Sequence, residues 1–211
     1  MPGLRIAAIH NGELDHAPAR DLIDELAEQA STVTEVTEQA PFAAVPNLTE
    51  LATWRRGQSE LEMNWARYLQ RPRSALTSLI GRIVFEAGIR ISPARRSDSW
   101  RIRQVEKAVT GKHVRAWRDF LDSTDTELLV LESDAIRTEA TAEILTNLLR
   151  SPSERPRYVN LAGGLDPGTL GIDQLAGDPW DVDARLTAYR RPVTNTSCAY
   201  LINRPMAQLA I

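Results

Sequence analysis

The sequence predicts an α/β fold with a central sheet and a helical insertion at about residues 47–103. Residues 4–10 (LRIAAIH) and 128–131 (LLVL) are short apolar runs typical of buried strands. Between them, residues 17–30 have the apolar periodicity of an amphipathic helix, and residues 32–38 are rich in β-branched side chains. A strand, a helix and a strand in this order indicate a parallel βαβ unit.

The composition is that of an ordinary globular protein. The chain has 211 residues, of which 43% are hydrophobic and 25% are charged, so it can form one domain with a sizeable core. The net charge of -3 gives no global reason to expect a nucleic-acid partner. A single cysteine, Cys198, excludes an internal disulfide and favours a reducing compartment. Neither a signal peptide nor an 18-residue apolar window is present, and a cytoplasmic protein is therefore expected.

The insertion is predicted to be helical and rich in arginine. Three helical segments span residues 47–90, and Asn47 followed by Glu50 resembles a capping box. From Arg71 to Arg103 there are eight arginines but only two acidic residues. Two interpretations stay open, namely a site for an anion or an anionic membrane surface, and a solvated helical face.

The second half alternates helices and strands. Residues 99–123 are predicted to be a helix, interrupted near Gly111, with His113, Trp117, Phe120 and Leu121 on one face. Further elements are predicted in a simple order: a helix at 138–150, strands at 157–163, 185–192 and 197–203, and a last helix with Pro205 in its first turn. Residues 162–184, rich in glycine and proline, are predicted to be a long loop.

Two carboxylates, Glu132 and Asp134, follow the apolar strand in LLVLESDA (residues 128–135). In an open α/β sheet, ligands bind just outside the carboxyl ends of the strands, so these acids are candidates for a ligand site. The alternative is structural: Glu132 is a solvated strand end, and Asp134 caps the next helix.

Two stretches resemble the family 25 glycosyltransferases, which include sugar transferases of lipopolysaccharide biosynthesis. The first is KHVRAWRDFLDSTDTELLVLESDA (residues 112–135), with a Lys-His pair and a nearby aromatic on a helix, then a strand with an acidic end. The second is PVTNTSCAYLINRPMAQLAI (residues 192–211), with a Thr, a Tyr and an aliphatic pair before a helix. The resemblance covers roughly residues 100–211.

The resemblance implies a GT-A fold, which is a nucleotide-binding Rossmann-type α/β domain. It implies transfer of a sugar from a nucleotide-sugar donor to a bacterial surface glycan or glycolipid, with Mn²⁺ or Mg²⁺ on the donor diphosphate. Asp134 matches the last acid of the family pattern and becomes the expected metal ligand. Glu132 matches the first acid and, with His113, is expected at the donor site. The Arg-rich segment would then face an anionic acceptor or the inner face of the membrane, as a peripheral contact.

The chain departs from the family pattern at Ser133, where the family has Asp, and in ending within the last helix. A serine is a poor metal ligand, so the proposed site has one negative charge fewer. A second hypothesis is therefore a non-catalytic or degenerate GT-A-like binding domain. A third is an unrelated α/β nucleotide-binding module.

Other residues are assigned with their alternatives. Asn11, at the end of the first strand, is expected to meet the nucleotide, since the first βα turn lies there. Asn195 is assigned to donor binding, although a polar turn before a strand explains it equally well. Trp117, Tyr200 and Cys198 are interpreted as packing residues. The catalytic base is not identified; the candidates by loop location alone are Asp166, Asp173 and Asp181.

Overall fold

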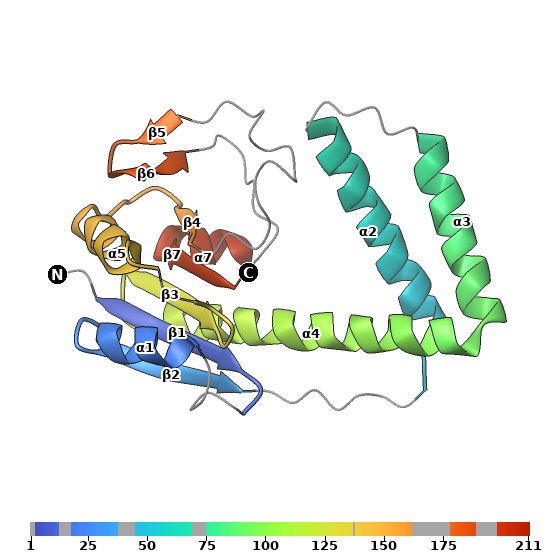
Figure 1. Cartoon of the computed structure of the whole chain (residues 1–211), viewed down its shortest axis with the longest axis horizontal. Helices are drawn as coiled ribbons and strands as arrows, with labels where there is room; N and C mark the ends of the chain where they lie inside the picture. Colours follow the sequence, from blue (N-terminus) through green and yellow to red (C-terminus); the bar gives the residue numbers. More distant parts are fainter. Residues whose placement is uncertain are drawn as a thin grey trace. The chain divides into compact units, whose positions relative to one another are not determined.

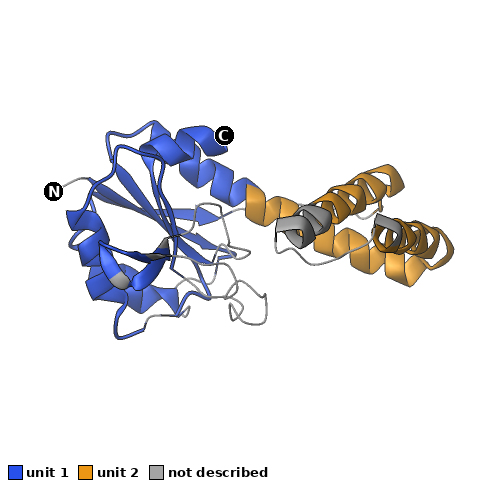
Figure 2. Cartoon of the chain, turned by 90° about the horizontal axis from the view of Figure 1, so that it is seen from above, with its two compact units in different colours: residues 1–38, 111–211 blue, residues 39–110 orange. Residues whose placement is uncertain are grey.

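The computed structural model describes residues 3–12, 18–37, 45–68, 75–136, 138–161, 178–188 and 198–211. The chain divides into two compact units (Figure 2). The first, the α/β unit, comprises residues 1–38 and 111–211, and the second, the helical unit, comprises residues 39–110. The insertion predicted at about 47–103 falls inside the helical unit.

The α/β unit is built on a five-stranded mixed sheet (Figure 1). Its strands are β1 (Leu4–His10), β2 (Thr32–Thr37), β3 (Glu127–Glu132), β4 (Tyr158–Asn160) and β7 (Ala199–Asn203), in the order β2-β1-β3-β7-β4. Strand β1 is parallel to both β2 and β3, whereas β7 runs antiparallel to β3 and β4. The α/β class and the initial parallel βαβ unit are thus confirmed.

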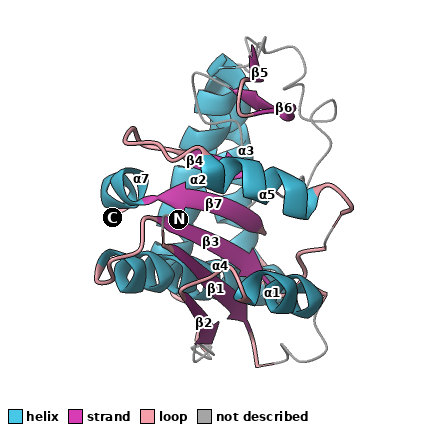
Figure 3. Ribbon diagram, turned by 90° about the vertical axis from the view of Figure 1, so that its left-hand side faces the viewer, coloured by secondary structure: helices cyan, strands magenta, loops and turns pink. Residues whose placement is uncertain are grey.

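Helices cover both faces of this sheet (Figure 3). On one face, Leu129 and Leu131 of β3 pack with apolar residues of α1 (Ala19–Ala27) and α5 (Thr141–Arg150). On the other face, Leu128 and Val130 pack with α4 (Pro93–Leu121) and α7 (Arg204–Ala210). Successive strand residues point to opposite faces, which explains why β3 is a continuous apolar run rather than an alternating one.

Asn203, at the junction of β7 and α7, holds several backbone groups together. Its Oδ1 accepts from the backbone N–H of Met206 at 3.2 Å and of Arg157 at 2.8 Å. Its Nδ2 donates to the carbonyls of Ser153 and Arg155. Asn203 therefore caps α7 and anchors the segment before β4. The predicted last helix is confirmed, with Pro205 in its first turn.

The segment from residue 178 corrects a prediction. Residues 178–184 were expected to belong to a loop, with a strand at 185–192, but β5 (Asp178–Trp180) and β6 (Asp183–Ala188) form a two-stranded antiparallel sheet. Strand β6 overlaps the predicted strand, whereas β5 was not predicted. Asp183 accepts from Asn147 of α5 at 3.0 Å, and Arg185 pairs with Glu143 of α5 at 2.9 Å. A three-residue strand with a central proline has no readable periodicity, so contacts with α5, rather than pattern, define this hairpin.

The helical unit contains α2 (Leu48–Tyr68), α3 (Ala75–Ile91) and the part of α4 up to residue 110. The predicted cap is confirmed, because Asn47 Oδ1 accepts from the backbone N–H groups of Thr49 and Glu50 at 3.1 Å. Leu51, Ile89 and Trp100 form a small buried core. Trp54 and Phe85 pack against this core.

Helix α4 also departs from the prediction. It begins at Pro93 rather than at residue 99, and it continues through Gly111, where an interruption was predicted. A mid-helix glycine costs about 1 kcal/mol relative to alanine. The next helical turn buries Lys112, His113 and Ala116 in the α/β unit, and this packing outweighs the glycine cost. Among the described residues, no helix is both long and apolar enough to span a bilayer.

Candidate ligand site at the carboxyl end of the sheet

The carboxyl ends of β1 and β3 lie side by side. The two strands are parallel, and Ile9 near the end of β1 is in register with Glu132 at the end of β3. From β1 the chain passes through α1 to β2 on one side, and β3 lies on the other side. The strand order therefore reverses between β1 and β3. In open α/β sheets, ligands bind in the crevice outside the strand ends at such a point.

A hydrogen-bonded chain of four side chains ends at Glu132. Trp117 Nε1 donates to the Tyr200 hydroxyl at 2.8 Å, and that hydroxyl lies 2.9 Å from His113 Nδ1. His113 Nε2 in turn lies 3.1 Å from Glu132 Oε1. His113 and Tyr200 are buried, whereas Glu132 is half-buried. These hydrogen-bonded side chains join three elements, α4, β7 and β3, at one point.

The direction of these hydrogen bonds follows from the acceptors. An ionised carboxylate only accepts, so His113 Nε2 carries a proton and donates to Glu132. In the neutral imidazole, Nδ1 is then an acceptor for the Tyr200 hydroxyl. Burial holds the pKa of Tyr200 well above its usual range, although the hydrogen bond from Trp117 lowers it, and the charges of Tyr158 and then Glu132 add smaller increases. The phenol therefore keeps its proton. The hydrogen bonds from Trp117 through Tyr200 and His113 therefore orient the Glu132 carboxylate.

Lys112, next to His113 on α4, joins the same region to the end of β1. Its Nζ donates to the carbonyl of His10 at 2.9 Å and to Asn11 Oδ1 at 2.5 Å. Lys112 is buried, whereas Asn11 is exposed. Because the amide oxygen of Asn11 accepts from Lys112, its amide nitrogen is the end that can donate to a ligand.

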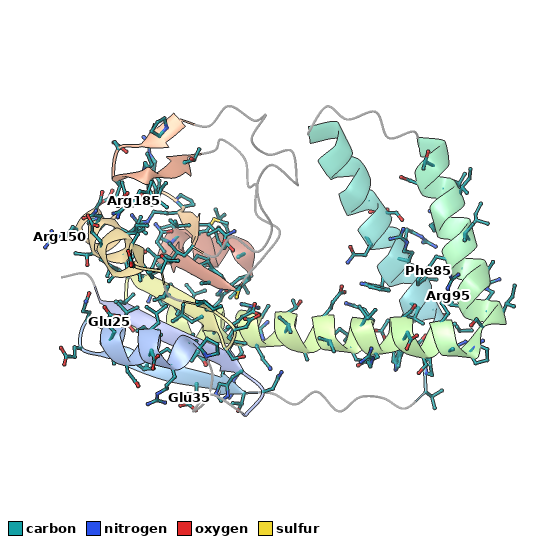
Figure 4. The ribbon with its side chains drawn as sticks, viewed as in Figure 1. Glu25, Glu35, Phe85, Arg95, Arg150 and Arg185 are labelled. Carbon is teal, nitrogen blue, oxygen red and sulfur yellow. The ribbon has the colours of Figure 1, made fainter. Side chains whose placement is uncertain are left out.

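The turn after β1 has a defined shape. Gly12 has φ of 96°, a left-handed conformation that favours glycine, and its N–H donates to His10 Nδ1 at 3.0 Å. His10 Nε2 lies 3.4 Å from Glu35 Oε2, an ion-pair distance without hydrogen-bond geometry. Glu35 belongs to β2 (Figure 4). Its contact with His10 therefore connects the turn to the neighbouring strand.

Asp134 lies in the turn after β3 and is exposed. Cys198 Sγ donates to Asp134 Oδ1 at 3.0 Å. Burial and then this hydrogen bond raise the pKa of the Cys198 thiol to about 12. The backbone of Ser133 joins neighbouring elements, because its N–H donates to the Ile9 carbonyl at 3.0 Å. The N-cap position of the next helix, α5, is Ala140, so Asp134 does not cap that helix. Asp134 instead contacts Cys198, the residue just before β7.

The structure brings several of the predicted residues together. Glu132 and His113 are in contact, and Asn11 is joined to them through Lys112. Asn195 lies outside the described residues, as do Asp166 and Asp173. Asp181 is exposed in the turn between β5 and β6, and within the described part of the chain no contact links it to Glu132.

Three residues of this cluster were not assigned to the site from sequence. They are Lys112, Trp117 and Tyr200. Lys112 carries a signal that could have been used, since it is one of only two lysines in a chain whose other basic residues are arginines. Apart from their place in the two stretches that resemble family 25, Trp117 and Tyr200 carry none, because an aromatic at helical or strand spacing is usually a core residue. Their polar atoms become informative only when the partners are known.

Metal-ligand groups are sparse here. Among the described residues, no group of three or more His, Cys, Asp and Glu side chains is arranged to hold a metal ion. The described residues at this edge of the sheet include two carboxylates, Glu132 and Asp134, each with a partner in the structure. This set suits a cation that takes most of its oxygen ligands from a substrate and water, and does not suit an all-protein cage.

Two open grooves, of about 540 and about 460 Å³, belong to the helical unit instead. Both are lined by Trp54, Gln58 and Arg103. Glu50 lies 3.6 Å from Arg103 and 3.2 Å from Lys107, and Glu106 accepts from Trp54. Glu50, Arg103 and Glu106 of the groove linings are thus engaged by partners within the helical unit. Comparison with protein-family models, curated proteins and solved structures finds no significant match to this chain.

Proposed function

We propose that the chain binds a nucleotide-sugar donor at the carboxyl ends of β1 and β3 and transfers the sugar to a glycan or glycolipid acceptor. The observation that carries this proposal is the convergence of Asn11, Lys112, His113 and Glu132 where the strand order reverses. Fixed donors and acceptors at that place are what a nucleotide requires. The proposed reaction, sugar transfer, and the proposed GT-A fold both come from the resemblance of residues 112–135 and 192–211 to family 25 glycosyltransferases.

The side chains divide into direct contacts and supports. Asn11 would donate its amide N–H to an oxygen of the nucleotide. Glu132 would accept from a hydroxyl of the ribose or the sugar, because a carboxylate that is already oriented loses little entropy on binding. Lys112, His113 and Tyr200 act behind these two as positioning residues, since each is buried and holds a neighbour.

A divalent cation fits this arrangement only together with the donor. Mg²⁺ and Mn²⁺ prefer oxygen ligands, and Mg²⁺ is commonly bound by one or two carboxylates plus phosphates and waters. Asp134 would be the protein ligand, with Glu132 next to it on the same strand end. Bound there, the cation would neutralise charge that develops on the diphosphate leaving group. We place the reaction in the cytoplasm, where nucleotide sugars would be the donors.

A second candidate function is binding without transfer. Ser133 replaces an acidic residue of the family pattern, and the described residues hold no cluster of three metal-ligand side chains. A degenerate domain of this kind would keep nucleotide affinity and lack turnover. The two functions differ only in the chemical step, so binding and hydrolysis have to be measured separately.

Calorimetric titration of UDP into the whole chain, with and without Mn²⁺, tests the site. Binding that depends on Mn²⁺, is lost in Asp134→Ala and is kept in Asp119→Ala is the expected result. Asp119 is a suitable control because it is exposed and lies on α4. If UDP binds, hydrolysis of UDP-sugars then separates the transferase from the binding domain. A folded wild type that binds no UDP, GDP or CDP with or without Mn²⁺ contradicts both functions.

A further inference from the structure

Helix α3 is apolar on two opposite faces. One face, which carries Phe85, packs inward (Figure 4). Ile89 is buried, and Phe85 meets Trp54 of α2 edge-to-face, with ring centroids 6.1 Å apart. The other face carries large aliphatic side chains that are exposed: Leu79 42%, Ile80 52%, Ile83 57%, Val84 56% and Ile91 81%. At 3.6 residues per turn these five residues form one stripe about 140° wide. We call it the α3 stripe.

The stripe is larger than scattered surface apolar residues would explain. Single exposed aliphatic side chains are normal on any protein, whereas a contiguous apolar face marks an interaction surface. Among the described residues of the helical unit, the inward face already accounts for the contacts with Leu51 and Trp100. The described residues therefore do not cover the α3 stripe.

The helical unit that carries this stripe has an excess of positive charge. Residues 39–110 carry 12 Arg and Lys against 6 Asp and Glu, a net charge of +6, whereas the rest of the chain carries 13 against 22, a net charge of -9. Three arginines gather at the end of α3 beside Ile91. Arg90 is exposed, Arg96 donates to the carbonyls of Ile89 and Arg90, and Arg95 packs on Gly88. An apolar stripe with guanidinium groups at one end matches the boundary between lipid tails and anionic headgroups.

We propose that the α3 stripe docks the helical unit onto an anionic lipid bilayer, with Ile80, Ile83, Val84 and Ile91 in the acyl boundary and Arg90 and Arg95 at the headgroups. A second copy of the chain fits less well, because a twofold contact would oppose two surfaces of the same +6 unit. Nucleic acid also fits less well, because phosphates gain nothing from aliphatic side chains. The proposal needs no nucleotide and stands apart from the donor site.

Vesicle co-sedimentation of the whole chain, without nucleotide, tests the docking surface. Binding is expected with equimolar phosphatidylcholine and phosphatidylglycerol, and little with phosphatidylcholine alone. It should weaken as NaCl is raised from about 0.1 to about 0.5 M. The double variant Ile83→Asn/Val84→Asn should bind at least about tenfold more weakly, because two apolar side chains no longer enter the acyl boundary. Arg90→Gln/Arg95→Gln should lose the preference for the anionic lipid.

Matched controls come from the α/β unit. Leu209 is 71% exposed on α7, and Arg118 is exposed near the end of α4, so Leu209→Asn and Arg118→Gln should leave vesicle binding unchanged. Equal binding by wild type and Ile83→Asn/Val84→Asn overturns the proposal, as does failure of the folded wild type to sediment with anionic vesicles. If the wild type does not bind vesicles but self-associates, and the same double variant abolishes this self-association, the stripe contacts a second copy of the chain. That result also overturns the proposal.

Discussion

His113 Nε2 lies 3.1 Å from Glu132 Oε1, so a residue of helix α4 holds the carboxylate at the end of strand β3. The other ring nitrogen of His113 lies 2.9 Å from the buried Tyr200 hydroxyl. The orientation of a half-buried carboxylate thus depends on a phenol that lies on a different strand. This dependence can be tested through the state of the imidazole ring.

Tyr200→Phe removes the hydroxyl between Trp117 and His113. In the wild type, the neutral ring of His113 should carry its proton on Nε2, because Nδ1 accepts from Tyr200. In the variant this preference should weaken, and nitrogen chemical shifts of labelled histidine report the change. Stability should fall by about 1–3 kcal/mol, since the N–H of the half-buried Trp117 loses its acceptor.

Tyr158→Phe is the control for that experiment. Tyr158 stacks on Tyr200 with centroids 5.0 Å apart, and the substitution retains the Tyr200 hydroxyl. The His113 tautomer should then match the wild type. An unchanged tautomer in Tyr200→Phe would show that Tyr200 does not orient His113.

Cys198 should react slowly with thiol reagents at neutral pH. Burial and the hydrogen bond to Asp134 raise its pKa to about 12, so little thiolate is present and the alkylation rate should keep rising with pH beyond about pH 9. Asp134→Asn removes the nearby negative charge and should lower this pKa. Iodoacetamide labelling across a pH series measures both effects. A wild-type rate that levels off near pH 9 contradicts the contact, and Asp119→Asn is the matched control.

Arg157→Met should destabilise the fold by about 3–5 kcal/mol. Arg157 Nη2 lies 2.6 Å from Glu127 Oε1, with side-chain exposures of 6% and 2%, so the variant leaves a buried carboxylate without its counter-charge. Burial raises the pKa of Glu127 while Arg157 opposes the rise. Removing Arg157 raises this pKa further, and the stability of the variant falls as pH rises through it.

Urea unfolding at about pH 5 and about pH 8 measures this effect, with the larger deficit expected at the higher pH. Arg155→Met is the control, because the Arg155 side chain is exposed and the change should lie within about 0.5 kcal/mol. A deficit that is the same for both variants would contradict the role of the buried pair.

Asp125 should make the fold sensitive to acid. Burial raises its pKa, but hydrogen bonds from Ser31, Arg5 and Ser123 outweigh burial and hold it below the model-peptide value of 3.8. A lowered folded-state pKa contributes stability that is complete above the unfolded-state value and is lost as pH falls through the folded-state value. The stability difference between wild type and Asp125→Asn should therefore shrink below about pH 3.8.

Chemical denaturation across a pH series follows this difference. Asp122→Asn serves as the control, because Asp122 is exposed and lies only three residues away. A difference that stays constant down to the lowest pH at which the wild type folds would rule out Asp125 as the acid-sensitive group.

The sequence pattern was sufficient to predict a helix, a strand or a cap wherever residues close in the sequence determine the local structure. The apolar run at 128–131, the Asn47 cap and the helix at Pro205 were predicted because period, capping chemistry and fixed φ act within a few residues. The predicted interruption of the helix at Gly111 was wrong, because distant residues determine the structure there. Burial of Lys112, His113 and Ala116 in the α/β unit overrides a local glycine cost.

The sequence by itself determined the α/β class, the initial βαβ unit and the carboxylates at the end of β3, because each depends on neighbours along the chain. Only the tertiary structure decided that β7 inserts antiparallel between β3 and β4, and that Lys112 reaches Asn11 while Tyr200 reaches His113. These contacts join residues 101 and 87 positions apart. Such pairings depend on strand order and on which faces pack together. Neither of these produces a periodic pattern in the sequence from which it could be predicted.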